Sequence, residues 1–177
     1  NEPDAARLAT AIGHARQCVD LDDTLAEGHA TLAFLLVSAG KFTEAVAAGR
    51  RAVSLDPHDW RHLFRLGHAA WGSERLDALK RALTIYGDLA FAHFYIAMVH
   101  IARNQLPTAV EVLHQGVALQ DRQAGRESRY PASGLHWLLG MVYLAQGDTG
   151  RALAECRREL DASSGATSRV WGKEFAM

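Results

Sequence analysis

The chain has 177 residues, of which 49% are hydrophobic, and its formal net charge at pH 7 is −1. A protein that binds nucleic acid or an anionic membrane normally carries a basic stripe, so this balance argues against both kinds of partner. The longest apolar runs are too short to span a bilayer, and no signal segment opens the chain. We therefore expect a cytoplasmic protein, and the missing initiator methionine indicates a fragment of a longer one.

Residues 1–25 are predicted to contain one helix, at about Asp4–Asp20. Asp22 and Asp23 follow it, at the place where the next helix would begin, and short acidic side chains are favoured helix caps. The segment is interpreted as the second helix of a hairpin whose first helix has been cut away.

Residues 26–59 form the best-defined unit, with two helical blocks. The first block ends at Gly40 and the second at Asp56-Pro57, because glycine commonly follows a helix end and proline fits a helix start. Small residues in this unit keep fixed spacings: Ala33 to Gly40 is 7 residues, Ala33 to Ala45 is 12, and Ala45 to Ala52 is 7.

The same spacings recur later in the chain. They are reproduced by Ala97, Asn104, Ala109 and Gly116, and in part by Gly140, Gly147 and Ala152. Small residues at fixed offsets let two helices approach closely. A helix-turn-helix period of 34 residues with this pattern resembles the tetratricopeptide repeat family. The resemblance implies an all-α, right-handed solenoid of helix-turn-helix repeats.

We predict a single repeat domain over residues 1–177. Its parts are a partial repeat at 1–25, repeats at 26–59, 60–89, 90–123 and 133–164, an insertion at 124–132, and a partial repeat at 165–177. The second full repeat is four residues short near Trp71, and Ser73 followed by Glu74 suggests a capped restart there. The insertion is expected to be a loop or a helix extension, with a partner contact as the alternative.

Nothing in the chain points to catalysis. No GxSxG, P-loop, HExxH, CxxC or GxGxxG arrangement is present, so we expect neither an enzyme nor a cofactor site. His58 and His62 are four apart and could share a metal, but they straddle a helix start and no third ligand is spaced to complete a site. No metal site is therefore predicted.

Other polar residues are given structural roles. His29, His93 and His136 hold equivalent positions and are expected to be buried and hydrogen-bonded, while Cys18 and Cys156 are expected to be buried, reduced and too far apart to bridge. The carboxylates on second helices are expected to lie on a solvated outer face; they are Glu44, Glu111 and Glu155.

The resemblance also implies that first helices line a concave groove. Its exposed positions should lie three before, one after and four after the small residue, offsets that share one helical face. All but one of these positions are apolar: Ala30, Phe34, Val37, Phe64, His68, Trp71, Phe94, Met98, Ile101, Trp137, Met141 and Leu144. The Lys and Asn residues of the chaperone-tail-binding members are absent from them.

An apolar groove suits an amphipathic helix or an apolar peptide. We therefore predict a non-catalytic protein-interaction or scaffold region. One alternative is that the groove is tightly curled or filled by another segment of the same protein. A second is a regulatory or substrate-selecting repeat region of a larger enzyme, such as a glycosyltransferase or a signalling protein. Apolar surface around Val19 and Trp171–Phe175 further predicts a homodimer through the terminal helices.

Overall fold

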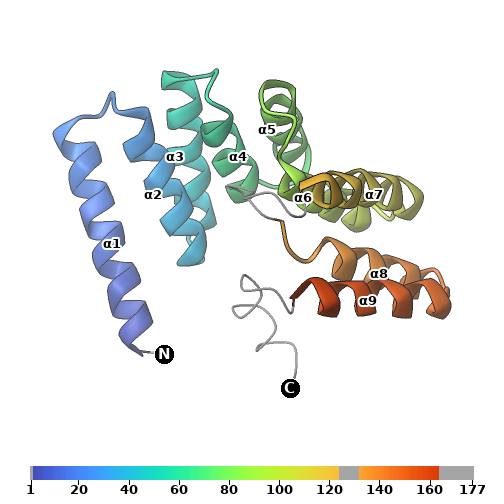
Figure 1. Cartoon of the computed structure of the whole chain (residues 1–177). Helices are drawn as coiled ribbons and strands as arrows, with labels where there is room; N and C mark the ends of the chain where they lie inside the picture. Colours follow the sequence, from blue (N-terminus) through green and yellow to red (C-terminus); the bar gives the residue numbers. More distant parts are fainter. Residues whose placement is uncertain (1, 124–131, 164–177) are drawn as a thin grey trace. The chain divides into compact units, whose positions relative to one another are not determined.

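A computed structural model of the chain describes residues 2–123 and 132–163, and all of its regular elements in these ranges are α-helices (Figure 1). They are α1 (Glu2–Leu21), α2 (Ala26–Ser38), α3 (Phe42–Leu55), α4 (Trp60–Ala69), α5 (Gly72–Ile85), α6 (Ala90–Ala102), α7 (Leu106–Gln123), α8 (Leu135–Ala145) and α9 (Thr149–Ser163). Among these described helices, none is both long and apolar enough to cross a membrane.

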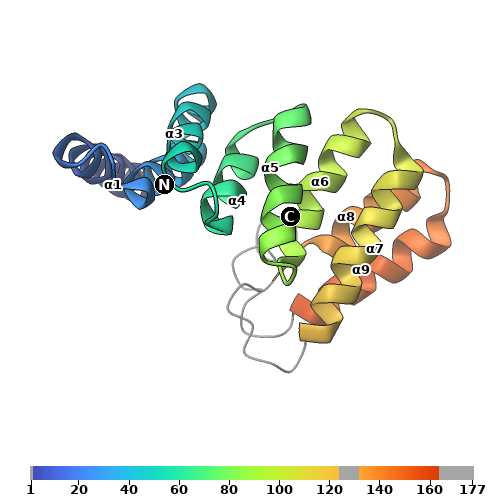
Figure 2. The same ribbon diagram turned by 90° about the horizontal axis from the view of Figure 1, so that it is seen from above.

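The helices belong to two compact units, Asn1–Gly87 and Asp88–Met177. In the first unit, α2 pairs with α3 and α4 with α5, while α1 packs on α2, and α4 packs on α2 and α3. In the second unit, α6 pairs with α7 and α8 with α9, and α7 packs on α8 (Figures 1 and 2). Each unit is therefore built from helical hairpins stacked on one another.

Three of the hairpins share one turn, which sequence spacing predicted at Gly40, Asn104 and Gly147. All three residues have a positive φ, between 56° and 79°. In each turn the next amide donates back to a carbonyl five residues earlier, as Lys41 does to Leu36 at 2.9 Å. This left-handed turn satisfies carbonyls at the helix end and explains why glycine or asparagine stands there.

The fourth hairpin, α4–α5, is shorter, as predicted. Helix α4 has 10 residues, whereas α2 and α6 have 13. The predicted cap at Ser73 is wrong: α5 begins at Gly72, and its N-cap Trp71 makes no side-chain capping bond. The turn between α4 and α5 is shorter than those of the other hairpins. The backbone is extended at Trp71, and α5 begins at the next residue, Gly72, whose φ is 64°.

Small residues lie where helices meet. Ala33 and Ala97 are fully buried. A Cβ atom built on Gly67 would lie 2.6 Å from the Leu79 side chain, and one on Gly140 would lie 3.1 Å from the Ala152 carbonyl oxygen. The helices are thus so close that Ala33 and Ala97 leave room for a methyl group only, while Gly67 and Gly140 leave too little room even for that. This confirms the predicted role of the small residues.

Capping and charge placement differ from the prediction at two points. Asp22 does not cap α2; its carboxylate accepts from the Thr24 amide at 2.9 Å, and the α2 N-cap is Leu25 without a side-chain bond. Glu155 is buried rather than solvated, because His136 Nδ1 donates to it at 2.7 Å and Arg158 neutralises it.

The predicted histidine and cysteine roles are confirmed only in part. His29 is buried and donates to the Asp23 carbonyl at 2.9 Å, and His93 is half-buried. Both cysteines are free, as predicted, but they are half-buried rather than buried. Val19, predicted to be exposed, is half-buried beside Gly28 of α2, and Trp171–Phe175 lies outside the described residues. The homodimer stays a prediction.

Gly116 gives the sharpest test of the packing. A Cβ atom there would lie 2.8 Å from His93 Cβ on α6 and 2.9 Å from Leu135 Cδ2 on α8. We expect Gly116→Ala to destabilise the fold by roughly 1–3 kcal/mol through overpacking, although alanine is the better helix former by about 1 kcal/mol. Urea unfolding followed by circular dichroism measures the change.

The matched control is Gly13→Ala. Gly13 lies inside α1 with nothing within 4 Å of the new Cβ atom, so this variant should gain stability by up to about 1 kcal/mol. A Gly116→Ala variant that gains as much stability as Gly13→Ala would contradict close packing at Gly116.

Candidate functional site

The predicted apolar positions on the first helices form two patches, one in each unit. We call the first the α2–α4 patch; it comprises Phe34 of α2, Phe64 and His68 of α4, and Trp71. Trp71 was predicted to lie on the first helix, but it follows the end of α4 and is the N-cap of α5. Phe34 is 47% exposed and Trp71 54% exposed, while Phe64 and His68 are half-buried. Phe34 and His68 are in contact across the two helices, with ring centroids 5.7 Å apart.

Arg75 of α5 lies at the end of this patch, and the sequence analysis did not predict its role. Its side chain is buried, and it donates to the carbonyl oxygens of Gly67 at 2.9 Å and His68 at 3.1 Å. The guanidinium also lies 4.4 Å from the centre of the Trp71 ring. One arginine therefore satisfies the end of α4 and holds the exposed indole in a cation–π contact.

His68 is the polar member of the α2–α4 patch. Burial lowers its pKa to about 4, and the positive charge of Arg75 acts in the same direction. The imidazole is therefore neutral near pH 7 and adds no charge to the α2–α4 patch.

The second patch lies on α8 and we call it the α8 stripe. It comprises Trp137, Met141 and Leu144, which are 36%, 44% and 51% exposed. These three residues step by four and three, so they share one helical face. On the neighbouring α6, the side chains of Phe94, Met98 and Ile101 are half-buried and pack against the core of the second unit.

The structure therefore separates the predicted groove positions into exposed and covered ones. Ala30, predicted to be exposed, is fully buried, because α2 is flanked by α1, α3 and α4 and a methyl group does not reach past them. Val37 is half-buried and packs on the core of the first unit. The large exposed side chains are those of Phe34, Trp71 and the α8 stripe.

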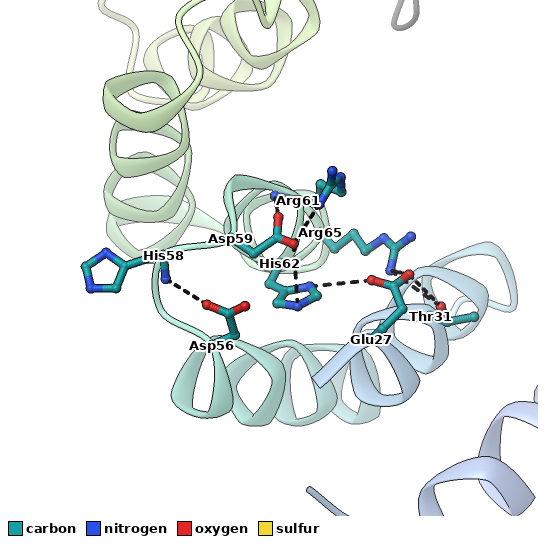
Figure 3. Close-up of polar contacts among 8 residues, drawn as sticks. All are labelled: Glu27, Thr31, Asp56, His58, Asp59, Arg61, His62 and Arg65. Carbon is teal, nitrogen blue, oxygen red and sulfur yellow. Dashed lines mark hydrogen bonds and ion pairs between the residues drawn. The ribbon is translucent and has the colours of Figure 1, made fainter. Parts of the chain in front are cut away.

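A polar cluster, also missed by sequence reasoning, lies where α2, α3 and α4 meet (Figure 3). Asp59 caps α4 by accepting from the Arg61 amide at 2.8 Å. Glu27 of α2 pairs with Arg65 of α4 at 2.6 Å. Buried His62 lies between these carboxylates, whereas His58 is exposed and outside the helix.

Asp59 is ionised in this cluster. Burial by itself raises the pKa of its carboxyl group, but the hydrogen bonds from the Arg61 amide and side chain, together with the charge of Arg61, outweigh that effect. The pKa of Asp59 is therefore held below its usual value.

A model of the tetratricopeptide repeat family matches residues 31–90 and 94–167, which together are more than half of the chain. A search of curated protein sequences with this chain found no match.

Solved structures of similar fold include that of TTC0263, a thermophilic TPR protein of Thermus thermophilus. It has a TM-score of 0.71 and 20% identity, and the match covers 93% of this chain and 87% of that one. The crystal structure of MamA has a TM-score of 0.68 and 18% identity, with coverages of 90% and 91%. YrrB, described as a TPR protein with an unusual peptide-binding site, has a TM-score of 0.59 and 15% identity, with coverages of 97% and 86%. At these identities the likeness shows the fold alone.

The low pKa of His68 predicts a pH-dependent stability. In the unfolded chain a histidine takes up a proton near pH 6.5, whereas folded His68 does so only near 4. Between these values the unfolded state binds more protons, so the free energy of unfolding falls as the pH is lowered. One such group contributes a slope of up to about 1.4 kcal/mol per pH unit.

We expect His68→Gln to flatten the decline in stability between pH 6.5 and about 4, as measured by urea unfolding at successive pH values. His93, whose pKa burial also lowers, keeps part of the slope in the variant. Equal slopes for the parent and the His68 variant would contradict the prediction.

Proposed function

Because the chain belongs to the tetratricopeptide repeat family, we propose that it is a non-catalytic interaction scaffold whose first helices hold an apolar peptide or an amphipathic helix. Proteins of this family bind protein or peptide partners and are generally non-catalytic. The proposal extends that general role to one surface and one chemistry of partner.

The observation that carries the proposal is the exposure of large apolar side chains on first helices. Trp137, Met141 and Leu144 are each at least one-third exposed, although the helix that bears them is otherwise packed into the core of the second unit. Tryptophan and methionine are suited to such a surface, since the first is a frequent anchor and the second adapts its shape to a partner.

The charge of the surface supports an apolar partner. The α8 stripe contains no ionisable side chain, and His68 in the α2–α4 patch is neutral near pH 7. A partner with a charged anchor, such as a terminal carboxylate, would find no cation among the exposed members of these patches. The apolar face of a helix, in contrast, would lose water-exposed area on binding.

The likeness to YrrB supports the same class of ligand. The structure of that protein is described as having an unusual peptide-binding site. Its repeats share the fold of this chain, so a peptide is a reasonable occupant here as well.

Two exposed members of the α8 stripe test the proposal. A random-peptide library displayed on phage is selected on the parent chain, and enriched peptides are measured by fluorescence anisotropy. We expect the double variant Trp137→Ser, Leu144→Ser to weaken their binding at least about tenfold, because the anchors are lost. Its circular dichroism should stay that of a helical protein, and its loss of stability should come chiefly from the covered part of the Trp137 side chain, which is 36% exposed.

The matched control is Leu153→Ser on α9. Leu153 is 52% exposed in the same unit but lies outside the α8 stripe, so its replacement should leave peptide binding unchanged. Failure to enrich any peptide, or equal binding by the double variant and the parent, would contradict the proposal.

A further inference from the structure

The polar cluster at the turn between α3 and α4 brings together three side chains with metal-ligating atoms. One such atom from each of Asp56, Asp59 and His62 lies within 4.8 Å of the others. Asp56 ends α3, Asp59 caps α4, and His62 lies in the first turn of α4. None of these residues belongs to the α2–α4 patch.

Acidic residues at a helix start often serve only as caps, so the cluster alone would not indicate a ligand. The second observation is His62 itself. Its side chain is only 4% exposed, and its buried Nδ1 has no hydrogen-bond partner in the described part of the chain. The closest carboxylate oxygens are those of Glu27, 3.8 Å from Nδ1, and of Asp59, 4.0 Å from Nε2 (Figure 3).

A buried imidazole nitrogen without a hydrogen bond is unfavourable, because burial removes its water and nothing replaces it. Here the ring lies between Glu27 on one side and the two aspartates on the other. That is the arrangement of a metal-binding histidine, whose second nitrogen commonly donates to a carboxylate.

We propose that Asp56, Asp59 and His62 bind one divalent transition-metal ion such as Zn²⁺, with Glu27 as the acceptor for the second ring nitrogen. His62 Nε2 and one oxygen from each aspartate are three ligands, and water supplies the rest. A ligand set of one imidazole and two carboxylates suits Zn²⁺ and other divalent first-row transition metals, whereas Mg²⁺ and Ca²⁺ prefer ligand sets of oxygen alone.

Binding requires a modest contraction of the cluster. Ligands bonded to zinc at about 2.0–2.2 Å lie closer together than the 4.8 Å limit that holds here. Asp56 is exposed, and the bond that its carboxylate accepts from the His58 amide is long, at 3.2 Å, so this side chain can turn inward. Asp59 must share or release the Arg61 guanidinium, which now lies 2.8 Å from its second oxygen.

The charge of the cluster favours a cation. Glu27, Asp56 and Asp59 bring three negative charges, and Arg61 and Arg65 bring two positive ones. A bound ion would link the end of α3 to the start of α4 and, through Glu27, to α2. The expected consequence is a protein that unfolds at higher temperature when the metal is present.

Isothermal titration calorimetry with ZnCl₂ tests the proposal on the EDTA-treated, dialysed chain at pH 7. We expect a single saturable site and a higher melting temperature with zinc. His62→Gln should abolish this site, whereas His58→Gln, which removes an exposed histidine four residues away, should leave it intact. Equal losses in both variants, or no loss in His62→Gln, would mean adventitious surface binding and overturn the proposal.

Two further measurements test the same site if His62→Gln does not fold. Asp56→Asn alters an exposed side chain outside the helices and should weaken zinc binding at least about tenfold with unchanged circular dichroism. MgCl₂ should give no comparable binding. Unchanged zinc affinity in Asp56→Asn, or magnesium binding as tight as that of zinc, would contradict the ligand set.

Discussion

The close approach of helices at small residues is the constraint on which the rest of this structure depends. Gly116 of α7 lies so near α6 and α8 that an added Cβ atom would come within 2.9 Å of both helices. In two other hairpins, an added Cβ atom on Gly67 or Gly140 would also come too close to the neighbouring helix. Since interiors pack densely, a larger residue at any of these positions would have to displace a neighbouring helix.

Tight packing on one side of a helix decides what remains on the other. In helix α8, Gly140 packs against α9, and the Leu135 and Leu139 side chains pack into the core. Trp137, Met141 and Leu144 lie on another face of the helix and are exposed. Their exposure follows from the geometry of the hairpin, and a partner can use it. The same reasoning applies to Phe34 on α2, which lies next to the fully buried Ala33.

Local signals in the sequence were sufficient for the repeats. Spacing identified Gly40, Asn104 and Gly147 as turns, and the family match confirms the predicted tetratricopeptide resemblance and its all-α helix-turn-helix fold. Long-range contacts were not predictable in this way. Arg75 reaches back to the end of α4, Ala30 is covered by neighbouring helices, and Glu27 meets His62 from another hairpin. The repeat boundaries and the alternative of a regulatory region within a larger enzyme stay predictions.

The most direct test of the account is the accessibility of the Met141 methyl group, followed by NMR on chain labelled with ¹³C-methyl methionine. A neutral, water-soluble paramagnetic agent should broaden the signal of exposed Met141 more than that of half-buried Met98. A saturating library-selected peptide should then protect Met141. A Met141 signal already protected in the free chain would mean that the protein covers its own surface. Broadening that the bound peptide leaves unchanged would place its site elsewhere, and either result would contradict the account.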